Sequence, residues 1–145
     1  MVKISTEPIL IGTELFARKG NEILLGKRGK NAFGAGTWAL LGGHLEFGEK
    51  LADCLAREMK EEIGAEIDPE DLKLITVVDD TPPENTKHYV HISFELINPN
   101  FTPQISEPDQ CDEWRYFDLN HLPENIFQFH RAIIENYKNK VLYEK

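Results

Sequence analysis

The stretch that decides the fold runs from Gly42 to Ala65 and reads Gly-Gly-His-Leu-Glu-Phe-Gly-Glu-Lys-Leu-Ala-Asp-Cys-Leu-Ala-Arg-Glu-Met-Lys-Glu-Glu-Ile-Gly-Ala. Its second half has apolar residues at intervals of three and four, which predicts one buried stripe of an amphipathic helix. The residues of this stripe are Leu51, Ala52, Leu55, Ala56, Met59 and Ile63. Gly64 ends the predicted helix, because glycine readily adopts the left-handed conformation that closes a helix.

Three glutamates stand on the opposite face of the predicted helix. Glu58, Glu61 and Glu62 are three and four residues apart, so their β-carbons lie about 5–6 Å from one another. Like charges at that distance repel, and a hard divalent cation among them makes the arrangement favourable; Mg²⁺ or Mn²⁺ prefers such a shell of carboxylate and water oxygens. Arg57 can hold one of these carboxylates, or Glu49, through its fork of donors. The helix therefore predicts a metal site.

The first half of the stretch predicts a turn before the helix. Gly42, Gly43 and Gly48 allow a loop that folds back over the helix start and presents a backbone carbonyl to the same metal. Glu46 and Glu49 stand near the helix N-terminus, a position that favours acids through the helix dipole alone. A solvated acidic helix after a turn would explain these charges without any chemistry, but the fixed spacing of the charged and glycine positions favours a functional site.

As a pattern, the stretch has Gly43, five residues, Glu49, seven residues, and then Arg57 to Gly64 as Arg-Glu-Met-Lys-Glu-Glu-Ile-Gly. This pattern resembles the signature of the Nudix hydrolases, with every charged and glycine position filled. Two positions depart from the family pattern: Ala65 replaces a larger aliphatic residue, and Leu41 stands where many members have proline. Both departures concern packing rather than chemistry.

The resemblance implies hydrolysis of a nucleoside diphosphate linked to another group, X, by attack of water on a phosphorus of the pyrophosphate bridge. Divalent metal ions neutralise the phosphoryl oxygens and activate the water in such reactions, so Mg²⁺ is expected, with Mn²⁺ as a substitute. By position in the motif, the implied metal ligands are Glu58, Glu61, Glu62 and the backbone carbonyl of Gly42. Glu58 and Glu61 are both candidates for the general base, and a residue on a later loop is the alternative. Arg57 is the implied orienting residue, with Glu49 as its partner.

Matches outside this signature are similar to the MutT-homologue nucleotide diphosphatases, which cleave nucleoside triphosphates to monophosphate and pyrophosphate. They are Leu24 to Arg28, Gly34 to Gly36, His88 to Val90, Glu107 and Pro108, and then Cys111 and Trp114. They cover most of residues 8–135 and favour a nucleoside triphosphate as substrate, including an oxidised or modified one. ADP-ribose or another nucleotide sugar is the alternative, because the signature recognises only the pyrophosphate and the metal. A sensor that binds a nucleotide without cleaving it is a remote third reading, since such a domain would have lost carboxylates of the signature.

Five residues outside the acidic helix are candidates for binding the substrate: Lys27, Arg28, His44, His91 and Phe127. Lys27 and Arg28 would approach the phosphates, or else form an ordinary solvated strand end. His44 would bond a phosphate or fix its own loop, and His91 would line the base pocket or have a structural role. Phe127 would form an apolar wall for the base, although its helical spacing with its neighbours favours core packing.

The composition bounds the class of protein. The 145 residues, 41% hydrophobic and 28% charged, predict one globular domain over 1–145, with the signature at 43–65. A net charge of −9 argues against a nucleic-acid polymer as partner, whereas a small nucleotide binds an acidic pocket through bridging metal ions. The sequence contains neither a membrane-length apolar run nor a secretory signal, so a cytoplasmic protein without membrane contact is expected. Two cysteines are too few for a disulfide framework. A homodimer is an option only because members of the family are often dimers.

The rest of the chain predicts strands around these helices. Strand-forming segments are residues 8–18, 22–28, 37–41, 71–78, 87–97 and 113–118, with a loop expected at 79–86. Apolar residues at helical spacing predict a second helix from Asn125 to about Lys140. Local patterns alone indicate an α+β or α/β protein, which agrees with the α/β/α sandwich, a mixed β-sheet between helices, that the Nudix resemblance implies.

Overall fold

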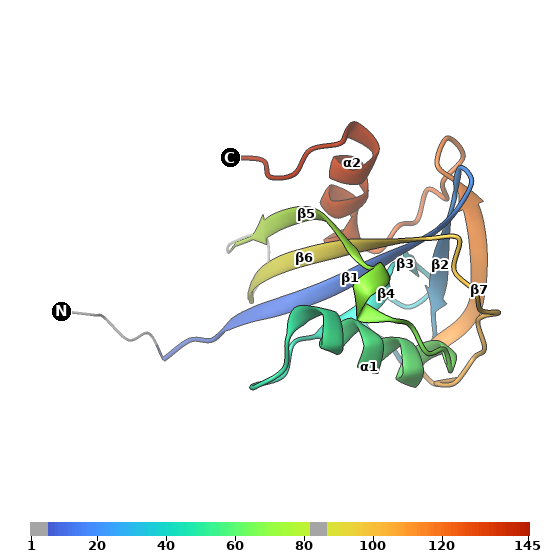
Figure 1. The fold of residues 1–145 in the computed structure, drawn as a ribbon, viewed down its shortest axis with the longest axis horizontal. Helices are drawn as coiled ribbons and strands as arrows, with labels where there is room; N and C mark the ends of the chain where they lie inside the picture. Colours follow the sequence, from blue (N-terminus) through green and yellow to red (C-terminus); the bar gives the residue numbers. More distant parts are fainter. Residues whose placement is uncertain (1–5, 82–86) are drawn as a thin grey trace.

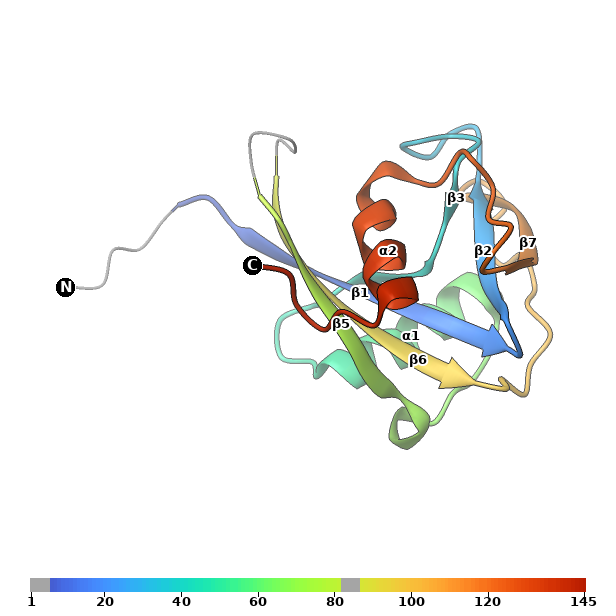
Figure 2. The same cartoon turned by 90° about the horizontal axis from the view of Figure 1, so that it is seen from above.

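The structure is a computed structural model that describes residues 6–81 and 87–145. One helix lies on each side of a mixed β-sheet: the sheet lies between them in Figure 1, and in Figure 2 one helix is in front of the strands and the other behind them. This arrangement confirms the α/β/α sandwich expected from the sequence.

The strands and helices follow one another in a simple order. They are β1 (Ile9–Lys19), β2 (Glu22–Arg28), β3 (Trp38–Ala39), β4 (Leu41–His44), α1 (Leu51–Ile63), β5 (Lys73–Asp80), β6 (His88–Ile97), β7 (Cys111–Asp118) and α2 (Arg131–Asn139). Short 3₁₀ helices, Pro69–Asp71 and Gln128–His130, precede β5 and α2.

The sheet opens between β1 and β2. Along the main path the strand order is β3-β2-β1-β6-β5, with β4 paired to β1 and β7 to β2. β1 runs parallel to β6 along its whole length, from Ile9 to Arg18. By contrast, β1 and β2 pair only beside their connecting turn, where Arg18 faces Ile23 and Lys19 faces Glu22. The two strands therefore diverge away from this turn, and β4 takes the free edge of β1.

Helix α1 packs its apolar stripe against one face of the sheet. Leu55, Met59 and Ile63 are buried on this stripe and pack with apolar residues of β1, β2 and β4. Cys54 is also buried, with its sulfur 3.2 Å from the Thr13 hydroxyl. Gly64 closes the helix in the left-handed conformation, with φ 69°. The helix predicted from the spacing of apolar residues is confirmed, and its last turn ends at the expected glycine.

The second helix begins later than the sequence predicts. Residues from Asn125 were expected to be helical, but α2 starts at Arg131. The backbone before it pairs with β3 instead: the Trp38 N–H donates to the Asn125 carbonyl at 2.9 Å, and the Phe127 N–H donates to the Trp38 carbonyl at 2.7 Å. Because these backbone groups are engaged across the fold, the helical spacing of Ile126 and Phe127 does not form a helix.

Two other boundaries differ from the sequence prediction. The expected loop at Gly42 begins instead as strand β4, in which Gly42 faces Glu14 of β1. A Cβ at position 42 would lie 1.9 Å from the Thr13 carbonyl oxygen, so glycine is needed for this close pairing. β5 continues through Asp80, which places the first residues of the expected 79–86 loop in a strand; residues 82–86 lie outside the described part of the chain. Neither helix in that part is long and apolar enough to cross a membrane.

Candidate active site

A cavity of about 780 Å³ opens where β1 and β2 diverge. Its walls come from strands β1, β2, β3, β4, β6 and β7, from helix α1, from the connection before β7, and from the segment before α2. Seven of the residues predicted from the sequence line it: Lys27, Arg28, Gly42, His44, Glu62, His91 and Phe127. The structure thus brings all five candidate substrate-binding residues and Glu62 of the acidic helix to one cavity, whereas Glu49, Arg57, Glu58 and Glu61 are outside its lining.

Strand β4 and helix α1 meet at two carboxylates. A Cβ at position 43 would lie 2.1 Å from the carboxyl carbon of Glu58, so only glycine leaves room for this side chain. One turn further along α1, Glu62 has an oxygen 3.4 Å from the Gly42 amide nitrogen, which donates to it. The glycine pair therefore lets both carboxylates lie directly against the strand backbone.

The surroundings of both carboxylates disfavour their charged forms. Burial, the Glu58 charge and the Glu107 charge raise the pKa of Glu62 well above its usual value, despite the Gly42 hydrogen bond. The pKa of Glu58 is also raised, mainly by burial, although Arg57 opposes the shift. A divalent cation relieves both effects, and the donors present are carboxylate and backbone oxygens, which hard cations such as Mg²⁺ prefer. The donors present are therefore of the kind preferred by the divalent metal that the Nudix resemblance implies.

The third predicted carboxylate stands apart from these two. Glu61 is about half exposed and lies 3.5 Å from an Arg57 nitrogen. Within residues 6–81 and 87–145, no three histidine, cysteine, aspartate or glutamate side chains are grouped closely enough to hold a metal ion. α1 therefore presents Glu58 and Glu62 to β4, whereas the side chain of Glu61 is turned toward Arg57.

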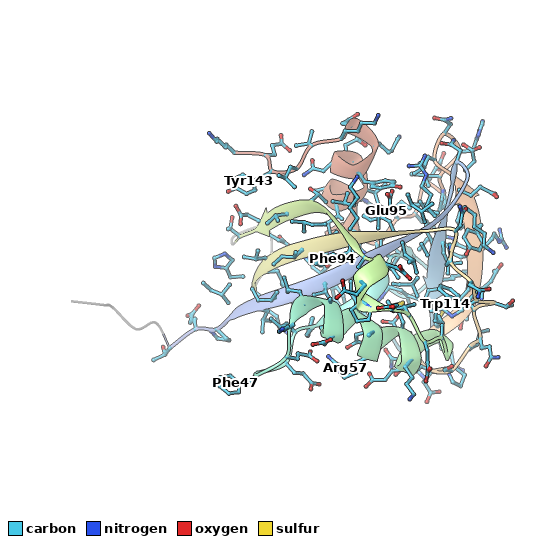
Figure 3. The ribbon with its side chains drawn as sticks, in the orientation of Figure 1. Phe47, Arg57, Phe94, Glu95, Trp114 and Tyr143 are labelled. Atoms are coloured by element: carbon cyan, nitrogen blue, oxygen red, sulfur yellow. The ribbon has the colours of Figure 1, made fainter. Side chains whose placement is uncertain are left out.

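Arg57 joins the helix to the turn before it. Its Nε and Nη2 donate to the two oxygens of Glu49 at 3.2 and 2.8 Å. Its Nη1 donates to Glu58 at 2.8 Å, and Nη2 also donates to the His44 carbonyl at 3.1 Å. The Arg57 hydrogen bonds lower the pKa of Glu49 to about 2. This is the pairing expected from the sequence, and Figure 3 shows Arg57 on α1.

Glu107 is a residue that sequence analysis left without a role. It lies in the connection between β6 and β7 and lines the cavity, and its charge raises the pKa of both Glu58 and Glu62. Its only signal in the sequence was an acidic residue before Pro108 within the wider matches. The structure places this carboxylate near the acidic end of α1.

Basic side chains line the cavity from β2 and from the residue just before β6. Lys27, Arg28 and Lys87 line it. The Arg28 guanidinium lies 4.4 Å from the centre of the Phe127 ring, and its Nε donates to the Phe33 carbonyl at 2.5 Å. Burial lowers the pKa of Arg28, against the attraction of Glu62. The strand end predicted at Lys27 and Arg28 therefore faces the cavity.

The wall from β1 and β6 contains a buried charge pair. His91 Nδ1 lies 2.5 Å from Glu14 Oε1, and the Ser93 hydroxyl donates to the other Glu14 oxygen at 3.0 Å. His91 Nε2 lies 3.5 Å from Asp80. Burial alone would lower the pKa of His91, but Glu14 and Asp80 raise it, and the net shift is upward. Sequence analysis missed Glu14, whose signal was the one acidic residue within a strand of mostly apolar residues.

Two groups of aromatic side chains complete the walls, one around Tyr89 and one around Phe127. His44 Nε2 lies 3.2 Å from the Tyr89 hydroxyl, and the Tyr89 ring stacks on His91. Phe127 is 7% exposed and lines the cavity as well as packing in the interior. Its ring contacts Phe33 and Phe129, so the apolar wall proposed for Phe127 has three aromatic members.

His130 also lines the cavity, although no sequence pattern pointed to it. Its Nδ1 accepts a hydrogen bond from the Leu40 amide at 3.0 Å. Burial, His91 and Arg28 lower its pKa to about 3. The two neighbouring histidines, whose rings are 6.3 Å apart, thus favour opposite protonation states.

Comparisons with known proteins identify the family. A family model described as the NUDIX domain matches residues 11–137. An ADP-ribose pyrophosphatase of Methanocaldococcus jannaschii is 36% identical over 119 residues, which are 82% of this chain and 67% of that protein. The nucleoside triphosphatase NudI of Escherichia coli is 32% identical over 101 residues, 63% of this chain and 70% of that protein.

A solved structure shares the fold at similar length. The crystal structure of a MutT NUDIX hydrolase from Burkholderia pseudomallei superposes with a TM-score of 0.79 at 29% identity, over 89% of this chain and 98% of that one. With the family match, the glycine pair and the carboxylates of α1 in place, the chain belongs to the Nudix family as a MutT-like hydrolase that acts on nucleotide pyrophosphate bonds.

Proposed function

We propose that this protein hydrolyses the pyrophosphate linkage of a nucleoside triphosphate, with release of the monophosphate and pyrophosphate, in the presence of Mg²⁺. The observation that carries the proposal is the meeting of Glu58 and Glu62 with the backbone of Gly42 and Gly43, beside a cavity with basic and aromatic walls. The acidic side suits a cation and the remaining walls suit a nucleotide.

The metal would be held by the carboxylates of Glu58 and Glu62 and by the Gly42 carbonyl. Glu107 lines the same cavity as Glu62, and Glu61 would join the metal ligands by turning away from Arg57. A bound divalent cation neutralises phosphoryl oxygens and lowers the pKa of water. Hydrolysis forms a bond from a water oxygen to phosphorus and breaks the bridging P–O bond, and the water proton passes to a base. Glu58 and Glu61 are the candidates for that base.

Arg57 is proposed as a positioning residue. It bonds Glu49, Glu58 and the His44 carbonyl at once, so it keeps the Glu58 carboxylate in one orientation relative to β4. A planar guanidinium with two parallel bonds to one carboxylate restricts rotation more than a single contact does. The residue therefore acts through Glu58 rather than on the substrate.

The basic side chains favour a triphosphate as the first substrate to test. Lys27, Arg28 and Lys87 line the same cavity, and a triphosphate has more charge for them to neutralise than a diphosphate bridge alone. The net charge of −9 argues against a nucleic-acid polymer at this site. A small nucleotide, free in the cytoplasm, is the substrate class proposed.

ADP-ribose is the second candidate substrate. The Methanocaldococcus jannaschii relative, 36% identical, bears the name ADP-ribose pyrophosphatase. The cleaved bridge is the same in both substrates, so the metal-binding residues would serve either one. The products separate the two: monophosphate and pyrophosphate from a triphosphate, against AMP and ribose 5-phosphate from ADP-ribose.

The test is a parallel hydrolysis assay with Mg²⁺ over the nucleoside triphosphates, oxidised deoxyguanosine triphosphate and ADP-ribose. Glu62→Gln removes one ligand charge, and Glu66→Gln changes an exposed glutamate just beyond α1 as the matched control. We expect the wild type and the control to release monophosphate and pyrophosphate, and Glu62→Gln to lose this activity. Equal activity in both variants would contradict the metal assignment, and turnover of ADP-ribose alone would select the second substrate.

A further inference from the structure

Most polar groups on the β1 and β6 wall of the cavity are already bonded to one another. His91 faces Glu14 with one ring nitrogen and Asp80 with the other. Glu14 receives His91 on one oxygen and the Ser93 hydroxyl on the second. Glu14, which also accepts from Ser93, thus satisfies one side of the His91 ring, whereas His91 Nε2 is buried without a hydrogen-bond partner among the described residues, 3.5 Å from the Asp80 carboxylate.

His130 lies beside these side chains and has one ring nitrogen committed to the backbone. β3 ends at Ala39 and β4 begins at Leu41, and the amide of Leu40 between them donates to His130 Nδ1 at 3.0 Å. A nitrogen that accepts this bond bears no proton, so a neutral His130 has its proton on Nε2. The pKa of about 3 keeps the ring neutral at ordinary pH.

The other nitrogen of His130 is left as a donor at the cavity. Among the described residues, Nε2 makes no hydrogen bond of its own, and it is not one of the fully enclosed unpaired atoms. The His130 ring packs perpendicular to the Phe127 ring, with 5.0 Å between the ring centroids, and the centroid of the His91 ring lies 6.3 Å from that of His130. The backbone bond thus sets the tautomer, while aromatic neighbours form the surface around the N–H group.

We propose that His130 is a specificity-determining residue, whose Nε2–H donates a hydrogen bond to a ring nitrogen or carbonyl oxygen of the nucleobase. The inference rests on the proposed function in one respect: the substrate must contain a nucleobase. Aromatic surface with a few fixed polar groups is the usual composition of a small-molecule site, and Phe33, Phe127 and Phe129 supply that surface here. A donor whose proton position is fixed by the backbone distinguishes acceptor atoms from donor atoms on the base.

Two substitutions separate this role from a structural one. His130→Asn keeps an oxygen acceptor near the Nδ1 position for the Leu40 amide, but has no donor at the Nε2 position. His130→Gln reaches further and offers an amide N–H there. Both variants replace a ring with a smaller side chain, so a packing defect affects both, whereas loss of the donor affects only the asparagine variant.

The experiment measures binding rather than turnover. AMP, GMP, CMP and UMP are titrated into the wild type and both variants by calorimetry, with ribose 5-phosphate as the base-free probe. We expect His130→Asn to weaken binding of the preferred monophosphate by about 2- to 10-fold, the range of one neutral hydrogen bond. Ribose 5-phosphate should bind all three proteins equally, and His130→Gln should restore most of the loss.

Three results would overturn the inference. These are equal weakening of the monophosphate and of ribose 5-phosphate, unchanged binding in His130→Asn, and a wild type that binds the base-bearing and base-free probes equally. Nitrogen-15 NMR of His130 adds a direct check, because the proposal requires a proton on Nε2 and none on Nδ1. The proposed function fails separately, if the wild type hydrolyses no nucleotide, so the two failures are distinguishable.

Discussion

Arg57 holds Glu49 by both carboxylate oxygens, with Nε at 3.2 Å from one and Nη2 at 2.8 Å from the other. The same guanidinium donates to Glu58 at 2.8 Å. One side chain of α1 therefore fixes the turn before the helix and a proposed metal ligand at the same time. Because one planar guanidinium bonds both carboxylates, a displacement of Glu49 should also displace Glu58.

Replacing Arg57 by lysine should lower kcat/KM by roughly 10–100-fold, the usual cost of losing a residue that orients a metal ligand. Lysine keeps the charge but cannot bond both Glu49 oxygens in a fork. Glu49→Gln should cause a loss of similar size, and the double variant should lose little more than either single one, because both act through one contact. Steady-state kinetics of the three proteins measures this, and additive losses would contradict it.

Glu62→Gln should make the protein more stable while removing activity. Burial and the Glu58 charge raise the pKa of Glu62, so the folded state binds this proton more strongly than the unfolded state. Wild-type stability therefore falls as pH rises from the ordinary glutamate pKa through the raised value. We expect the variant to gain on the order of 1 kcal/mol in free energy of unfolding at neutral pH without metal, and to lose hydrolysis.

Urea denaturation with and without Mg²⁺ checks this prediction. Added Mg²⁺ should stabilise the wild type by mass action and the variant much less. Glu66→Gln, which changes an exposed side chain, should show neither effect. A variant less stable than the wild type in metal-free buffer would show that the Glu62 charge is compensated within the protein.

Gly43→Ala should reduce activity by displacing Glu58. The added Cβ would lie 2.1 Å from the Glu58 carboxyl carbon, a separation that real atoms do not adopt, so one of the two must move. We expect a destabilisation of about 1–3 kcal/mol, as for overpacking elsewhere. The stability cost should shrink in a Glu58→Ala background, where the contact is absent. An equal cost in both backgrounds would place the strain elsewhere.

The pH dependence of stability should report on His130. Its pKa of about 3 in the folded protein lies below the ordinary histidine value, so between these two values the unfolded state binds more protons. Acidification through this window therefore destabilises the wild type, by about 1.4 kcal/mol per pH unit from this residue. In His130→Asn this contribution is absent. The difference in free energy of unfolding between wild type and variant, measured by denaturation at a series of pH values, should therefore change with pH at that slope. A constant difference would show that His130 is not held neutral.

Tyr137→Phe should separate stability from activity. The Tyr137 hydroxyl donates to Glu95 at 2.5 Å and accepts from Arg18 at 3.0 Å. Glu95 is on β6 beneath α2 (Figure 3) and is outside the cavity lining. Loss of a partner for this buried carboxylate should lower the free energy of unfolding by about 1–3 kcal/mol, measured by chemical denaturation. The kinetic constants kcat and KM should stay unchanged. A drop in kcat would link α2 to the active site.

The sequence determined the parts of the protein that depend on near neighbours in the chain. The stripe from Leu51 to Ile63 predicted α1, and Gly64 predicted its end, because helical contacts join residues three and four apart. The spacing of Glu49, Arg57 and Glu58 likewise predicted one connected acidic site. A mixed sheet between helices followed from the order of the strands and from the family resemblance.

Only the tertiary structure decided which distant residues share the cavity. Glu14 and His91 are 77 residues apart, and Leu40 and His130 are 90 apart; no local periodicity reports such pairs. The same long-range pairing overrode local pattern at Phe127, whose backbone bonds Trp38 instead of continuing α2. A backbone group satisfied across the fold is unavailable to a helix, so the helical spacing there did not decide the structure. The pattern of the acidic helix is therefore local information, whereas the wall that we propose to meet the nucleobase is assembled by long-range pairing.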